Sequence, residues 1–184
     1  MNFIETLKKS SQNLSKIQPM CICAMMLALR IVLGMFTNFT LSFAPFVKIG
    51  FSFLPIVIVA YLYGPVCAAV VSGLGDILSI IMSNPTAFSI MPGITLCYIF
   101  EGFLLGVALY KRSGLKNIIF AFILALFLCR LPLNTYVLHL MMNIPYAKLL
   151  LYRSAILIPF SVVEVSLSYF VIKYLSKLKI LQTK

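Results

Sequence analysis

The chain has 184 residues, of which 62% are hydrophobic and only 10% are charged, and its formal net charge is +11. Soluble domains are about 45–50% apolar and about 25% charged, so a soluble fold of this length is excluded. Only helices and closed barrels satisfy the backbone inside a bilayer. Barrel strands alternate apolar and polar residues, whereas the apolar runs here are long and unbroken. The composition therefore predicts an all-α membrane protein.

A helix needs about 20 mostly apolar residues to cross a bilayer. Six segments of the sequence meet this requirement and predict a bundle of six transmembrane helices: 19–36, 46–63, 65–83, 91–110, 117–138 and 155–174. The first segment has the basic flank of a signal peptide, but it contains Arg30 and has no clear small-residue cleavage site, so we interpret it as a retained helix. We expect residues 1–18 to be a short cytoplasmic amphipathic lead-in, 19–175 a single substrate-binding membrane domain and 176–184 a basic cytoplasmic tail.

The basic residues predict the orientation of the bundle. Lysines and arginines gather before the first segment, between the fourth and fifth, and at the end of the chain. Cytoplasmic connections carry such an excess, which also explains the positive charge without nucleic acid. Both termini are therefore expected in the cytoplasm. The outer connections would be 37–45, 84–90 and 139–154, where Lys148 and Arg153 are exceptions.

Five charged residues lie inside the expected spans, near the middle of the membrane. They are Arg30, Asp76, Glu101, Arg130 and Glu164. Charges at that depth are costly, so they face the interior and either pair or bind a ligand. One reading is mutual neutralisation, with Arg30 paired to Glu101 and Arg130 to Asp76. The other is ligand binding, and the two can coexist.

Arg130 and Asn134 share one helical face at a four-residue spacing, with Pro132 between them freeing a backbone carbonyl. A guanidinium fork suits a carboxylate, and an asparagine amide suits the edge of a heterocycle; a polar face that only binds water is the alternative.

In the loop before the fourth segment, Pro92 and Gly93 shape a backbone whose amides can face a ligand. Phe88 could stack on a planar ring, although aromatic residues at a membrane edge are more often anchors.

Signatures of enzymes and metal sites are absent from the sequence. The five cysteines form no CxxC pair and there is one histidine, so no metal site is expected. Neither a phosphate-binding Gly-x-x-x-x-Gly-Lys loop nor an HExxH motif occurs. We therefore expect no enzyme activity and no cofactor.

Ala24 and Ala28 have the four-residue spacing of small residues at close helix contacts, which serves either packing within the fold or docking to a partner.

Five stretches together resemble the substrate-binding S-components of energy-coupling factor vitamin transporters, and within them the folate family. The stretches are Ala24-Met-Met-Leu-Ala28, Lys48–Pro55 with Tyr63-Gly-Pro65, Gly73-Leu-Gly-Asp76, Pro92-Gly-Ile-Thr-Leu96, and Arg130 followed by Leu133-Asn-Thr135. They occur in the family's order from about residue 20 to 170. The loop Thr86–Pro92 departs from the Gly-Pro-Phe-Phe-Pro-Gly-like pattern of folate binders.

The resemblance implies a subunit of an ATP-driven importer in the bacterial plasma membrane. It implies two kinds of partner: a transmembrane coupling subunit, and two cytoplasmic ATPase subunits that hydrolyse the ATP. It also implies capture of a vitamin at the outer face, with folate as the first candidate. It places the partner contact at Ala24 and Ala28. Combined with the polar residues above, we expect a binding site formed by Arg130, Asn134, Asp76, Arg30, Phe88, Pro92, Gly93 and Arg153.

Two alternatives remain open. The first is the same kind of subunit for another vitamin or a modified-base precursor. The second is an autonomous ion-coupled carrier that uses Asp76, Glu101 and Glu164, against which the lack of an internal repeat counts.

Overall fold

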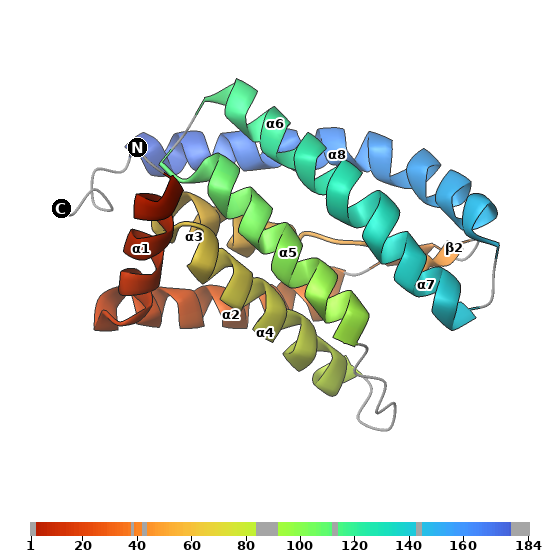
Figure 1. Cartoon of the computed structure of the whole chain (residues 1–184), viewed down its shortest axis with the longest axis horizontal. Helices are drawn as coiled ribbons and strands as arrows, with labels where there is room; N and C mark the ends of the chain where they lie inside the picture. The colour runs from red at the N-terminus through yellow and green to blue at the C-terminus, as the bar shows by residue number, and fades with distance from the viewer. Residues whose placement is uncertain are drawn as a thin grey trace.

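The computed structural model describes residues 3–37, 39–41, 44–83, 92–111, 114–142 and 145–177. Its elements in chain order are α1 (Phe3–Leu14), α2 (Ile17–Thr37), β1 (Phe39–Leu41), β2 (Ala44–Ile49), α3 (Phe53–Tyr63), α4 (Pro65–Ser83), α5 (Pro92–Leu109), α6 (Leu115–Ala125), η1 (Leu126–Leu133), α7 (Asn134–Met142) and α8 (Tyr146–Lys177). The long helices run lengthwise through one bundle, whereas α1 lies crosswise near one end (Figure 1). The predicted all-α membrane bundle is confirmed.

Five helical paths are long and apolar enough to cross a membrane among the described residues, and α3 is a shorter apolar helix. The path through residues 115–142 is continuous, but its middle, η1, is π-helical. There the Asn134 N–H donates to the Cys129 carbonyl, five residues earlier. Pro132 lies inside this segment and has no N–H to donate. A π turn is wider than an α turn, so it changes which face of the helix the following side chains occupy.

The expected second span, 46–63, is wrong in its first third. Residues 44–49 form β2, which pairs antiparallel with β1 through Phe39–Ile49 and Thr40–Lys48, and α3 begins only at Phe53. An 11-residue helix covers roughly 16 Å, about half of a bilayer core. β-branched and aromatic residues around Pro45, followed by Gly50, favour a strand and a break over a helix. The hairpin thus occupies the place of the missing half-span, and β2 contacts α8.

The last helix is longer than expected. α8 begins at Tyr146 rather than at 155, so most of the predicted outer connection 139–154 is helical. Lys148 and Arg153 are therefore helix residues, and Arg153 is buried. The sequence did not reveal this start, because Lys148 and Arg153 interrupt the apolar run by which the helix was predicted.

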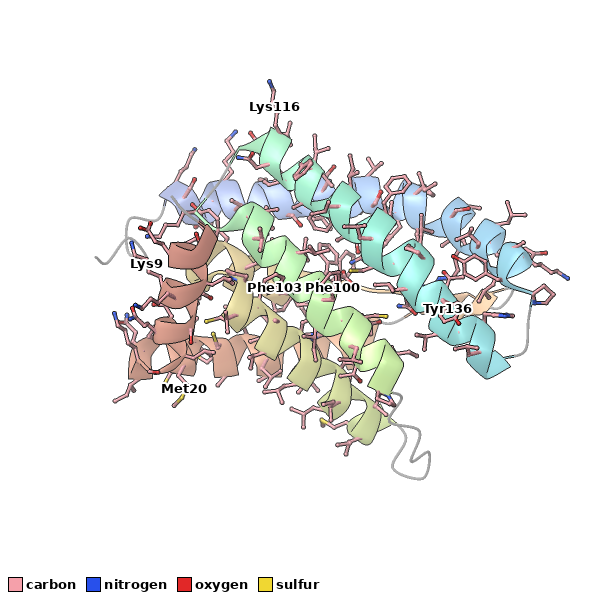
Figure 2. All side chains as sticks on the ribbon, in the orientation of Figure 1. Lys9, Met20, Phe100, Phe103, Lys116 and Tyr136 are labelled. Atoms are coloured by element: carbon pink, nitrogen blue, oxygen red, sulfur yellow. The ribbon has the colours of Figure 1, made fainter. Side chains whose placement is uncertain are left out.

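The lysines divide the bundle into two ends. The basic end carries α1, the α3–α4 junction at Gly64, the end of α5, the start of α6 and the last turns of α8. The opposite end carries the hairpin, the start of α5, the end of α7 and the start of α8. Figure 2 shows Lys9 and Lys116 projecting at the basic end and Tyr136 toward the other. The Lys111 N–H donates to the Tyr61 carbonyl at 3.1 Å, which ties α5 to α3 at the basic end.

The centre of the bundle is packed tightly around α4 and α5. A Cβ on Gly102 would lie 2.7 Å from the Ala68 carbonyl oxygen, and one on Gly106 would overlap the backbone of Pro65. These glycines let the two helices approach with no side chain between them. A core of small and aliphatic residues, including Val57, Ala60 and Leu105, continues this contact to α3.

Candidate functional site

Several buried polar residues lie toward the opposite end of the bundle. Four buried side chains each stand seven residues from the helix terminus at that end: Arg30 before Thr37, Asp76 before Ser83, Thr135 before Met142 and Arg153 after Tyr146. Seven residues correspond to about 10 Å of helix. Four different helices therefore carry a polar group at a similar distance from their ends at this side of the bundle, and we call these residues, with Thr95 and Tyr98 of α5, the polar layer.

Arg30 is held against α4. Its Nη1 donates to the Val71 carbonyl at 2.9 Å and to the Ser72 carbonyl. Its guanidinium also lies over the Tyr98 ring, 5.6 Å from the centroid, a favourable cation–π distance. The side chain is only 6% exposed. Arg30 thus joins three helices at the level of the polar layer.

Asp76 and Tyr98 occupy the centre of the layer. The Thr95 hydroxyl donates to Asp76 Oδ2 at 2.8 Å, and Asp76 interacts electrostatically with Arg30. The half-buried Tyr98 interacts electrostatically with both Arg30 and Arg153. Tyr98 therefore lies near two buried guanidinium groups.

Arg153 differs from the other interior arginines. It is 5% exposed, it has no ion pair to any described residue, and its Nε has no hydrogen-bond partner there. The Thr135 hydroxyl, seven residues from the end of the adjacent α7, also lacks a partner in the described part of the chain. Buried polar groups are normally paired. This side of the polar layer therefore has spare donors.

Below the polar layer, Arg130 forms an ion triad with two glutamates. Its Nη2 is 2.7 Å from Glu101 Oε1, its Nε donates to the same oxygen at 2.8 Å, and its Nη1 is 2.5 Å from Glu164 Oε2. The triad links η1 to α5 and α8. The predicted pairs Arg30–Glu101 and Arg130–Asp76 are therefore wrong. The π-helical turn, which no sequence period reveals, changes the direction in which Arg130 projects.

The other predicted residues are spread more widely. Pro92 is exposed and begins α5, and a Cβ on the next residue, Gly93, would lie 3.1 Å from both methyl groups of Val137 on α7. Asn134 is half-buried at the start of α7. Phe88 lies outside the described residues.

Ala24 and Ala28 are both exposed on a face of α2 other than the one that buries Arg30. They make no close helix contact within the described chain, in contrast to Gly102 and Gly106. Packing within the fold therefore does not account for their spacing.

Comparison with known proteins agrees with this architecture. The family "ECF transporter, substrate-specific component" matches residues 18–176. The chain belongs to this family. The folate transporter FolT of Clostridium novyi (strain NT) is 30% identical over 123 residues, which are 66% of this chain and 69% of that protein. A crystal structure of FolT bound with folic acid has the same fold, with a TM-score of 0.72 at 22% identity, over 83% of this chain and 90% of that chain.

An S-component of this family is a multi-pass protein of the bacterial plasma membrane and a part of a transporter, not an enzyme. Within the described residues of this S-component, no three His, Cys, Asp or Glu side chains gather where they could hold a metal ion.

Thr95 and Tyr98 of this S-component's polar layer were not predicted from the sequence. Thr95 and Tyr98 precede Glu101 at three-residue spacing and so share a face of α5 with it. Three polar residues in register within an apolar helix are the signal that could have identified them.

A surface hollow of about 390 Å³ does not belong to the polar layer. Its described lining is Lys148, Leu151, Tyr152 and Ala155. These residues form one exposed stripe of α8, on the side of the helix away from the buried Arg153. The hollow therefore opens outward from the bundle.

Proposed function

We propose that this S-component captures folate at the extracellular face and delivers it to an energy-coupling module for ATP-driven uptake. The polar layer lies about 10 Å below the opposite end, so a ligand would enter from that side. The name of the Clostridium novyi relative and the folic acid in the structurally similar FolT support folate as the ligand.

One observation carries the proposal: the buried Arg153 guanidinium has no carboxylate partner among the described residues. A buried, unpaired arginine is costly, and folate offers carboxylates that would pair with it through the guanidinium fork. Its flat pterin offers donors and acceptors for Asp76 and for the Asn134 amide. Arg30, Phe88, Pro92 and Gly93 remain proposed contacts around the same ligand.

Arg130 has a different proposed role. Both of its partners are carboxylates of the protein, so its fork is occupied. We assign it to the support of the site from below rather than to contact with the ligand.

The proposed partners are a transmembrane coupling subunit and two cytoplasmic ATPase subunits. The exposed Ala24 and Ala28 would let a partner helix approach α2 closely. The chain contains no phosphate-binding loop of its own, so ATP would be hydrolysed by the partners.

The proposed orientation follows from the lysines, with the basic end in the cytoplasm. Lys116 and Lys148 are both exposed and lie at opposite ends of the bundle. The variants Lys116→Cys and Lys148→Cys therefore form a matched pair for labelling with an impermeant reagent in intact cells. A Cys21→Ala background suits this experiment because the other four cysteines are buried. We expect labelling at 148 alone; labelling at 116 alone would reverse the orientation.

The ligand assignment is tested by purifying the protein and identifying any bound small molecule by mass spectrometry, followed by isothermal titration with folate and other vitamins. Saturable, one-to-one folate binding is the expected result. Binding of another vitamin by folded protein, with no heat from folate, would replace folate by that vitamin. Uptake of labelled folate into liposomes without any ATPase subunit would instead support an autonomous carrier.

A further inference from the structure

α1 presents a basic face away from the bundle. Its inner side carries Ser10, Asn13 and Leu14, which are buried or half-buried, whereas Glu5, Lys8, Lys9 and Gln12 are exposed at positions i, i+3, i+4 and i+7. The helix lies crosswise near the basic end of the bundle (Figure 1), and Lys9 projects outward from it (Figure 2). One side of α1 is therefore committed to the protein and the other is free.

Ser10 fixes α1 in this position. Its hydroxyl oxygen accepts hydrogen bonds from the Val66 N–H at 3.0 Å and the Cys67 N–H at 3.5 Å. These are first-turn amides of α4, which follows Gly64 and has no capping side chain just before it. The Asn13 amide also donates to the Tyr63 carbonyl at 3.4 Å. The cap of α4 thus comes from α1, so the orientation of the basic face is determined by the fold.

Apolar side chains stand next to the lysines. Lys16 is exposed at the corner between α1 and α2, and the following Ile17 and Met20 are 79% and 53% exposed. α2 is a membrane-spanning helix that starts at Ile17, so this corner lies at the depth where headgroups meet acyl chains. Lysines beside exposed apolar residues at that depth match a lipid interface.

We propose that Lys8, Lys9 and Lys16 bind the headgroups of anionic phospholipids, with Ile17 and Met20 inserted among the neighbouring acyl chains. Lysines near an anionic membrane surface attract it electrostatically. Glu5 is the only acidic residue on this face of α1, so little opposes the attraction. An acidic surface of a partner protein would match the lysines but would not account for the two exposed apolar side chains beside them.

The test compares lipid binding by the full-length protein in detergent micelles. Native mass spectrometry counts retained lipids, and thermal unfolding measures Tm, with dioleoylphosphatidylglycerol, dioleoylphosphatidylcholine or inorganic phosphate added. We expect phosphatidylglycerol, but neither other probe, to be retained and to raise Tm. The variant Lys8→Ser/Lys9→Ser/Lys16→Ser should bind it at least tenfold more weakly, and the corresponding triple arginine variant should bind it normally.

Matched single variants separate this face from general positive charge. Lys9→Ser should reduce phosphatidylglycerol binding, whereas Lys148→Ser, an exposed lysine at the opposite end, should not. Equal binding by the triple serine variant and the natural protein would overturn the proposal. A second result would also overturn it: the natural protein does not bind phosphatidylglycerol, and the triple serine variant fails to assemble with the coupling module. That result would assign the face to an acidic protein partner.

Discussion

Arg30 reaches α4 directly over Gly75. A Cβ at residue 75 would lie 2.6 Å from Arg30 Nη1 and 2.8 Å from its Cδ. The guanidinium can therefore donate to the Val71 carbonyl only because residue 75 has no side chain. The same contact holds α2, which carries the exposed Ala24 and Ala28, against the helix that carries Asp76.

Gly75→Ala should displace Arg30 and weaken both stability and ligand binding. Overpacking of this kind costs about 1–3 kcal/mol, and the displaced guanidinium would lose its carbonyl acceptors. Thermal unfolding and folate titration measure the two effects. Gly114→Ala is the control, because a Cβ there meets only the flexible Asn117 amide, at 3.3 Å. Equal Tm and affinity in both variants would show that Arg30 repacks without cost.

Arg130→Ala should act mainly through folding. It would leave Glu101 and Glu164 buried without their cation, and the loss of one partner of a buried pair costs about 3–5 kcal/mol. We expect a marked fall in Tm. The combined variant Arg130→Met/Glu101→Gln/Glu164→Gln removes all three charges and should recover most of the stability.

The combined variant also separates support from contact. If Arg130 only supports the site, folded protein of this variant should bind folate within a few-fold of the natural affinity. Loss of binding with Tm fully recovered would place at least one member of the triad in direct contact with the ligand, as the sequence context of Arg130 first suggested.

The span-length helices were predictable because each is encoded by a long apolar run. Their ends agree within a few residues for α2, α4 and α5, where Pro65 and Pro92 mark helix starts. The hairpin was not predictable from hydropathy, since residues 44–49 are mostly apolar despite Lys48 and lie next to the apolar helix that follows. The start of α8 was predicted wrongly for the opposite reason. Lys148 and Arg153 lower the local hydropathy, although Arg153 is buried.

The interior charges were predictable as a set but not as pairs. Any charge within a span must face the bundle, and the five predicted interior charges are buried or half-buried. Pairing depends on the rotation of each helix. The π-helical η1 alters that rotation between Ala125 and Asn134, so Arg130 meets Glu101 and Glu164 instead of Asp76.

Arg153→Gln should weaken folate binding without lowering Tm. The present arginine is buried without an ion pair to the described residues, so its removal relieves a cost in the empty protein. A charge-assisted hydrogen bond contributes about 1.5–3 kcal/mol, so the affinity should fall about tenfold or more. Arg153→Lys should restore only part of it, because a point charge cannot reproduce the fork. Isothermal titration checks this, and unchanged affinity in a folded Arg153→Gln protein would remove Arg153 from the site.

Ala24→Trp and Ala28→Trp should abolish transport while leaving folate binding by the isolated protein nearly unchanged. Both positions are exposed, so a large side chain fits the isolated protein but blocks the approach of a partner helix. Arg30 is close to both alanines along α2, about half a turn beyond Ala28, but it lies on a different, buried face, which is why binding should survive. The measurements are ATP-dependent uptake of labelled folate in liposomes with the coupling module, and titration of the isolated protein.

Ala147→Trp is the matched control for docking. Ala147 is also an exposed alanine, but it lies in the first turn of α8 at the opposite end. That variant should assemble with the module and transport normally. Normal uptake by either α2 variant would show that no partner helix packs against this face. Loss of folate binding in the isolated α2 variants would instead show that α2 has moved, since the bulky side chain would then have displaced Arg30 from the Val71 carbonyl.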